Sequence, residues 1–255
     1  MLWNGDSGTL TNCTFINNSA SGLGGAVYWN GPNGNLNNSI FTDNSVMLDN
    51  INVNKNDFNV TVGGGAIFWN GDSGNLNNST FNNNYVKINN VDVKVDVVKV
   101  AVGNDTINVG SVRVYVFGGA IYWSASKANL DKSIFKNNHV EINNIDASVG
   151  DIKIIDQDSN VTSVTGNFIV GTVGVQASGG AVYLNVSNSN LNNSIFNNNS
   201  ATINNINNIT LCNNRVTIDN KNITIELVSI AAYGGAVVFR GNNTILINSN
   251  FANNT

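Results

Sequence analysis

The segment Gly64-Gly65-Ala66-Ile67-Phe68-Trp69, followed by Phe81 and Asn84, decides the fold. It belongs to two short motifs that alternate along the chain, and the step from Ala66 to Phe81 is 15 residues in every linked pair. The copies are Gly24, Gly25 and Ala26 with Phe41 and Asn44; Gly64, Gly65 and Ala66 with Phe81 and Asn84; Gly118, Gly119 and Ala120 with Phe135 and Asn138; Gly179, Gly180 and Ala181 with Phe196 and Asn199; and Gly234, Gly235 and Ala236 with Phe251 and Asn254; an additional Phe15 and Asn18 precede them. Five pairs at one spacing indicate a stack of repeats.

The shortest full period, from Phe15 to Phe41, is 26 residues, a suitable length for one coil of a β-helix. The apolar residues do not recur with the period of about 3.6 residues that is typical of a helix. The chain has one proline and is rich in Val, Ile and Thr, which favours strands. The predicted fold is therefore all-β, a right-handed parallel β-helix (solenoid) with β-rich insertions between coils.

Two residues of each coil predict a corner. Leu36 and Phe41 are five residues apart, and an odd spacing cannot place both side chains on one face of a straight strand. Asn38-Ser39, a pair typical of turns, lies between them, so we expect a bend there and polar ladders where the turns stack. The paired glycines predict a second corner that needs positive φ or close backbone approach.

The spacers between the motifs vary in length, and residues 1–255 read as one repeat domain with variable segments at 45–63, 85–117, 139–178 and 200–233. Val91 to Val116 alternates apolar and polar residues on both sides of Gly103-Asn104-Asp105-Thr106, which predicts a protruding hairpin. The segments 151–176 and 216–230 predict either hairpins or extra degenerate coils.

Composition excludes several functional classes. Charged residues are 11% of the chain and no basic stripe is present, so we expect no nucleic-acid partner. Cys13 and Cys212 lie four coils apart, too far for a disulfide. No apolar run is long enough to span a membrane, and no secretory leader is visible. Both ends fall within a repeat, so we expect a fragment whose end coils contact flanking coils of a parent chain.

We expect no catalytic, metal or cofactor site. The carboxylates of the regular motifs are isolated, and His139 is the only histidine. The Asp6-Ser7-Gly8 and Asp72-Ser73-Gly74 turns lack the acid spacing of calcium loops. Many Asn-x-Ser/Thr sequons suggest a glycoprotein, at Asn12, Asn37, Asn59, Asn77, Asn104, Asn160, Asn185, Asn192, Asn222 and Asn242.

The alternating Gly-Gly-Ala-[Ile/Val] and Phe-x-x-Asn motifs resemble the repeat of the polymorphic outer membrane proteins of chlamydiae, and the asparagine-rich style is similar to adhesin-like surface proteins of methane-producing archaea. The resemblance implies a secreted β-helix of the cell surface or envelope that adheres to a glycan or protein receptor on a host or neighbouring cell. A carbohydrate-active or carbohydrate-binding β-helix and a passive spacer are the alternatives.

Overall fold

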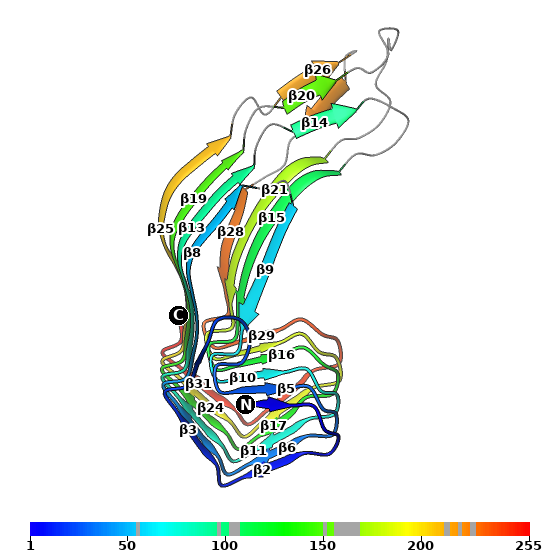
Figure 1. Ribbon diagram of the computed structural model, residues 1–255. Helices are drawn as coiled ribbons and strands as arrows, with labels where there is room; N and C mark the ends of the chain where they lie inside the picture. Colours follow the sequence, from blue (N-terminus) through cyan, green and yellow to red (C-terminus); the bar gives the residue numbers. More distant parts are fainter. Residues whose placement is uncertain are drawn as a thin grey trace.

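The computed structural model describes residues 1–54, 57–95, 98–101, 108–149, 152–155, 169–211, 215–218, 221–224 and 228–255. These residues form strands and turns without helices, and nearly all the strand pairs are parallel. Successive coils stack along one axis, from the N-terminal to the C-terminal end of the molecule (Figure 1). The predicted all-β parallel β-helix is confirmed.

Three six-stranded parallel sheets build the rod, and each coil contributes one short strand to each sheet. Sheet A contains β1 (Leu2–Trp3), β5 (Val27–Trp29), β10 (Ile67–Trp69), β16 (Ile121–Trp123), β22 (Val182–Leu184) and β29 (Val237–Phe239). Sheet B contains β2 (Thr9–Thr11), β6 (Asn35–Asn37), β11 (Asn75–Asn77), β17 (Asn129–Asp131), β23 (Asn190–Asn192) and β30 (Ile245–Ile247). Sheet C contains β3 (Thr14–Ile16), β7 (Ile40–Thr42), β12 (Thr80–Asn82), β18 (Ile134–Lys136), β24 (Ile195–Asn197) and β31 (Asn250–Ala252).

The rod core consists of columns of like side chains. Trp29 and Trp69 are paired in register and their rings stack with centroids 4.5 Å apart, and Phe41 stacks on Phe81 at 4.8 Å. All four side chains are fully buried. Because a coil covers its apolar face only with the coils above and below, the register of the motifs is what holds the stack together.

The predicted corner between the Leu and Phe columns is confirmed. Asn38 has φ 51°, and the residues at the same position of the other coils are also left-handed. Asparagine is the side chain that tolerates this region best after glycine. Each complete coil has several such positions, most of them asparagine, and they contribute to an asparagine content of about a fifth of the chain.

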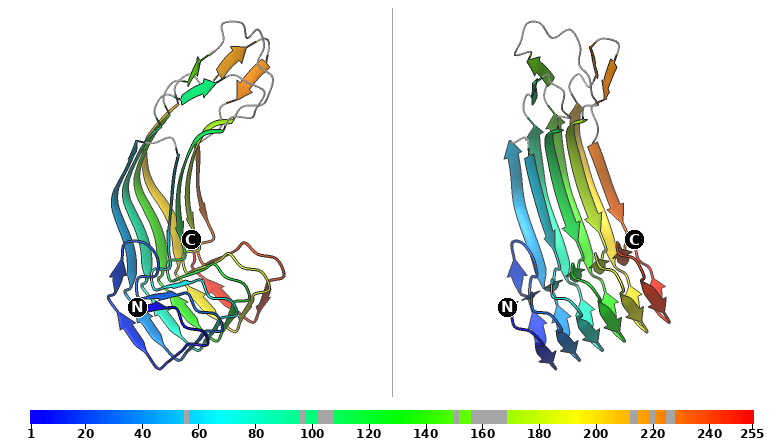
Figure 2. Two further views of the ribbon diagram at one scale, coloured as in Figure 1. Left: turned by 45° about the vertical axis from the view of Figure 1, so that its right-hand side comes forward. Right: turned by 90° about the vertical axis from the view of Figure 1, so that its right-hand side faces the viewer.

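The variable spacers form an arm that projects from one side of the rod (Figures 1 and 2). Its first layer, sheet D, contains β4 (Ser19–Ala20), β8 (Ser45–Asn54), β13 (Tyr85–Val95), β19 (His139–Val149) and β25 (Ser200–Leu211). Its second layer, sheet E, contains β9 (Asp57–Gly63), β15 (Asn108–Phe117), β21 (Ile169–Ser178) and β28 (Val228–Tyr233). Two small sheets lie farther out: β14 (Val98–Ala101) with β20 (Ile152–Ile155), and β26 (Arg215–Ile218) with β27 (Lys221–Thr224).

The predicted hairpin from Val91 to Val116 is wrong. Strand β13 pairs in parallel with β8 and β19, and β15 pairs in parallel with β9 and β21, so the outgoing and returning strands bond to neighbouring repeats rather than to each other. The buried valines of the two layers face one another across a second apolar core. Residues 103–106, the expected turn, lie outside the described residues.

The alternative of extra coils is not realised in the described strands either, because each spacer enlarges its own coil. One antiparallel pair does form, β26, which begins at Arg215, with β27, as the hairpin alternative for the segment 216–230 predicts. The longer strands pair in parallel with neighbouring repeats rather than antiparallel within one spacer, because adjacent spacers carry similar alternating patterns. Alignment in register then buries the inward-facing side of every strand.

Candidate functional site: the outer face of the arm

The motif residues of the inner coils lie in the interior and act as structural elements. Gly64 has φ 67°, and a side chain on Gly65 would place its Cβ in steric clash with the carbonyl oxygen of Gly119. Ala66 and Phe81 are fully buried. The same positions in the other inner coils repeat these roles, so the two corners that the sequence predicts explain the motif without a ligand.

The motif asparagines form a buried ladder whose hydrogen-bonding capacity is filled. The Asn84 side-chain nitrogen donates to the Phe41 carbonyl at 3.0 Å and to Asn138 Oδ1 at 3.0 Å. Its Oδ1 accepts from the backbone N–H and the side chain of Asn44. Both amide hydrogens and both acceptor positions are therefore used, and nothing remains for an external partner.

The last copy of the motif departs from this uniform role, because it stands at the end of the described stack. Asn254 is half-buried, whereas Asn199 one coil earlier is fully buried. The Asn254 Oδ1 accepts from the backbone N–H and the side chain of Asn199, both at 2.9 Å, and its side-chain nitrogen donates to the Phe196 carbonyl at 3.1 Å. The fourth bond of the ladder, which would run to a following coil, is not made among the described residues. Asn254 thus closes the ladder without being saturated.

A different asparagine ladder covers the outer face of sheet D. Ile88 and Val91 are both buried although they are three residues apart, because Asn90 between them is left-handed with φ 55° and shifts the alternation by one residue. Consecutive side chains, Asn89 and Asn90, therefore both point outward. The same pairing occurs at Asp49-Asn50, Asn143-Asn144 and Asn204-Asn205, which gives two adjacent columns that we call the double amide ladder.

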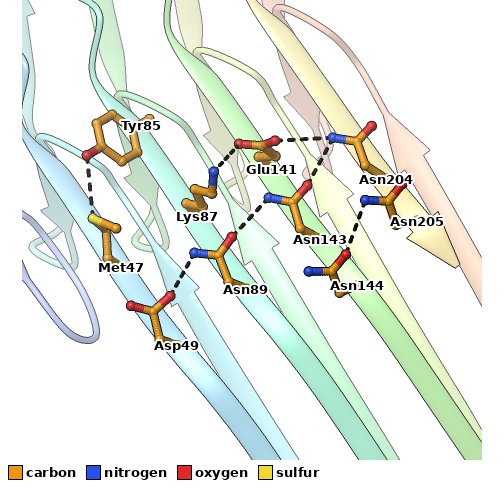
Figure 3. Close-up of polar contacts among 10 residues, drawn as sticks. All are labelled: Met47, Asp49, Tyr85, Lys87, Asn89, Glu141, Asn143, Asn144, Asn204 and Asn205. Carbon is orange, nitrogen blue, oxygen red and sulfur yellow. Dashed lines mark hydrogen bonds and ion pairs between the residues drawn. The ribbon is translucent and has the colours of Figure 1, made fainter. Parts of the chain in front are cut away.

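Each column is a chain of hydrogen bonds between neighbouring strands of sheet D, and Figure 3 draws the first column together with the Asn144–Asn205 bond of the second. In the first, Asn204 donates to Asn143, Asn143 to Asn89, and Asn89 to the Asp49 carboxylate at 2.7 Å. In the second, Asn205 donates to Asn144, Asn144 to Asn90, and Asn90 to Asn50. The charged acceptor at the end of the first column strengthens that series.

A small cluster of charged and aromatic side chains borders the double amide ladder on the rod side (Figure 3). Lys87 Nζ lies 3.1 Å from Glu141 Oε2. Tyr85 stacks on His139 with centroids 5.1 Å apart, and its hydroxyl donates to Met47 Sδ at 3.4 Å. One face of each ring is thus covered by the other ring.

Burial sets the ionisation of this cluster. Burial lowers the pKa of His139 below 6.5, against the opposing charge of Glu141. Burial alone would raise the pKa of Glu141, but hydrogen bonds from Lys87 and Asn143 and the Lys87 charge lower it overall. At neutral pH the cluster therefore holds a neutral imidazole beside a closed ion pair.

Within the described residues, no three His, Cys, Asp or Glu side chains come together to hold a metal ion. The carboxylate of Asp6 accepts from Asn33 and Ser7, and that of Asp72 accepts from Ser126 of the next coil. These hydrogen bonds lower the pKa of both carboxyls and assign them to turn ladders. Cys13 occupies the position of the stacked turn serines and is a free thiol, and Cys212 lies outside the described residues.

The sequons fall into two groups, those whose serine is buried and those whose asparagine is exposed. Ser39, Ser79 and Ser194 are buried in a serine ladder, in which each hydroxyl donates to the carbonyl two residues earlier, so the sequons at Asn37, Asn77 and Asn192 are closed in the folded chain. The sequon asparagines Asn12, Asn59, Asn185 and Asn242 are exposed. Asn104, Asn160 and the side chain of Asn222 lie outside the described part.

The double amide ladder was missed in the sequence, although a signal for it exists. Two polar residues are flanked by apolar ones at a spacing of three in Leu48/Ile51, Ile88/Val91, Ile142/Ile145 and Ile203/Ile206. Because a straight strand repeats every two residues, a recurrent spacing of three indicates a left-handed residue inside the strand.

No family model, curated protein or solved structure matches this chain. In the described ranges, the structure contains no helix with the length and apolar character needed to cross a membrane.

Proposed function

We propose that the chain is an adhesin-like structural protein of the cell surface or cell envelope, a repeat rod that presents its arm to a host or neighbouring cell. The observation that carries the proposal is the contrast between a constant rod and an arm of variable length. The rod repeats one buried pattern in its inner coils, whereas the length variation of the chain is concentrated in the arm.

The double amide ladder supports a contact role for the arm. The Asn50, Asn90 and Asn205 side chains are exposed, and each amide spends only part of its hydrogen-bonding capacity on its neighbours within the described structure. A long two-layer arm with a polar outer face offers a broad surface to a receptor, and insertions on one side of a solenoid commonly supply the binding face. The likeness of the motifs to surface repeat families points in the same direction.

A rod without the arm tests the proposal. The first coil closes with only Ser19-Ala20-Ser21-Gly22-Leu23 between Asn18 and Gly24, so the chain itself contains a template for a coil without an insertion. In the rod-only variant, these five residues replace 45–63, 85–117, 139–178 and 200–233. We expect the parent chain to bind saturably to cell surfaces and the rod-only variant to lose this binding while keeping its β-sheet circular dichroism. Equal binding by both proteins would assign adhesion elsewhere.

Carbohydrate binding is the second candidate, and the exposed amides favour it over a carbohydrate-active enzyme. An open hollow of about 370 Å³ beside the last coils is lined by Tyr233, Val238 and Arg240, with no carboxylate in its described lining. The paired acids that glycoside hydrolysis needs are absent from that lining. Incubation of the purified chain with polysaccharides, followed by a reducing-sugar assay, is expected to show no release.

A further inference from the structure

We infer that the double amide ladder binds a linear, uncharged polysaccharide whose chain runs along the rod axis, across the strands of sheet D. This inference rests on the proposed function and adds the site and the chemical class of the ligand. The site consists of the four rungs Asp49-Asn50, Asn89-Asn90, Asn143-Asn144 and Asn204-Asn205.

The comparison of the two asparagine ladders gives the first argument. In the buried ladder, Asn84 uses both amide hydrogens and both acceptor positions. In the double amide ladder, Asn90 donates one bond to Asn50 and accepts one from Asn144 within the described structure. One N–H and one acceptor position thus remain on Asn90, and likewise on Asn144, whereas Asn204 spends its second N–H on Glu141. A hydroxyl, which both donates and accepts, fits the free pair.

Spacing gives the second argument. The rungs belong to adjacent strands of a parallel sheet, so they repeat at about 4.8 Å along the axis. A linear polysaccharide whose advance per sugar matches this step can offer one hydroxyl to each rung, and four weak contacts add as one multivalent contact.

Preorganisation makes such contacts effective. Every amide is held by its neighbours along the column, as in Asn144 between Asn90 and Asn205, so binding freezes little additional side-chain motion. Immobilising a free polar side chain on binding otherwise costs conformational entropy. Because the amides of the ladder are already ordered in the folded chain, binding does not have to order them.

The charges of the face select against an acidic polymer. Lys87 pairs with Glu141 and Lys94 pairs with Asp92. Asp49, whose carboxylate accepts from the Asn89 amide, adds a further negative charge to this face. A uronic or sulfated chain would meet net negative charge, whereas a neutral hexose polymer would not.

The arm-face variant replaces Asn50, Asn90, Asn144 and Asn205 by glycine. Glycine keeps the positive φ of 54° to 57° and removes the second column of amides. The matched control replaces Asn38, Asn78, Asn193 and Asn248 by glycine, because these asparagines are also left-handed, exposed and stacked, but lie at a corner of the rod. Equal circular dichroism and thermal midpoints of the two variants establish that both are folded.

Pull-down with microcrystalline cellulose, insoluble β-1,3-glucan and chitin, and with immobilised polygalacturonate as the acidic polymer, tests the inference. We expect at least one neutral polymer to retain the parent chain and the corner control, and affinity to fall about tenfold or more in the arm-face variant, equivalent to about 1.4 kcal/mol. No retention by any neutral polymer, equal losses in the two variants, or preference for polygalacturonate would overturn it. Arm-dependent cell attachment without polysaccharide retention would defeat this inference alone and leave the proposed function standing.

Discussion

A single residue type, asparagine, performs two opposite tasks in this chain. Asn138 is buried and saturated, with bonds to the Phe81 carbonyl and to the amides of Asn84 and Asn199. Asn144 projects from the arm and keeps part of its capacity free within the described structure. Burial, not chemical identity, therefore separates a structural amide from one that can meet a ligand.

The first prediction compares these two environments. Asn138→Ala leaves the Asn84 backbone N–H and one Asn84 side-chain N–H without an acceptor, and it removes a donor from the Phe81 carbonyl. Each unsatisfied buried group costs about 1–3 kcal/mol, so we expect the free energy of unfolding to fall by about 3 kcal/mol or more. Asn143→Ala, on the outer face, is expected to cost less than about 1 kcal/mol. Urea denaturation followed by circular dichroism measures both, and similar losses would contradict the assignment.

The second prediction concerns pH and follows from the single histidine. The folded state lowers the pKa of His139 below 6.5, so the unfolded chain binds the proton more readily. Stability is then fully present above about pH 6.5 and is lost as the pH falls through that value toward the folded pKa. We expect the thermal midpoint to drop by a few degrees across this interval.

His139→Tyr is the matched variant, because Tyr85 occupies the equivalent position one coil earlier and the ring stack can be retained. Its thermal midpoint should stay constant over the same interval, where Glu141, with its lowered pKa, remains ionised. A parallel decline in the parent and the variant would mean that another group carries the pH dependence.

At the scale of elements, the sequence predicts the rod well and the arm poorly. Leu36, Phe41 and the turn between them occupy fixed positions in every coil. The corner, the columns of apolar side chains and the polar ladders of the stacked turns could therefore be predicted. For the arm, alternation of apolar and polar residues identifies strands, but it does not name the partner of each strand. Val91 and Val112 both face the same interior, which suits a hairpin and a stacked pair of layers equally well in sequence. Only the similarity of successive spacers distinguishes the two.

The third prediction uses this difference. Replacement of 85–117 by Ser-Ala-Ser-Gly-Leu, the connection of the first coil, removes β13 and β15 and leaves β8 and β19 without their shared neighbour. A hairpin could be removed without effect on adjacent coils, but a central layer strand cannot. We expect a lower thermal midpoint and increased light scattering from the exposed strand edges.

Two further variants check that result. Replacement of 200–233 alone removes a strand from the end of each layer, so it should destabilise the chain less than the loss of the central spacer. The rod-only variant, which has no arm edges to expose, should scatter less light than the variant that lacks only 85–117. Equal thermal midpoints and equal light scattering for the central and the terminal replacement would mean that the spacers fold independently of one another.

At the scale of the whole molecule, the two end coils present the faces on which a coil normally stacks. Leu246 and Phe251 are 49% and 41% exposed, whereas Leu191 and Phe196 in the preceding coil are fully buried. At the opposite end, Phe15 is half-buried, whereas Phe41 of the next coil, on which it stacks, is fully buried. The C-terminal face of one copy therefore matches the N-terminal face of another, in a head-to-tail contact that does not close on itself.

The last prediction is that this chain, purified alone, associates end to end as its concentration rises. Leu246→Lys with Phe251→Lys places charges on the stacking face and should lower the mass measured by light scattering. The control, Ile40→Lys with Ile134→Lys, changes residues that are 46% and 42% exposed but lie on the outer side of sheet C, so association should continue. Because the two pairs differ in direction rather than exposure, a reduction by the first pair alone assigns association to the coil ends. A monodisperse monomer at high concentration would instead mean that the open edges are blocked within the folded chain.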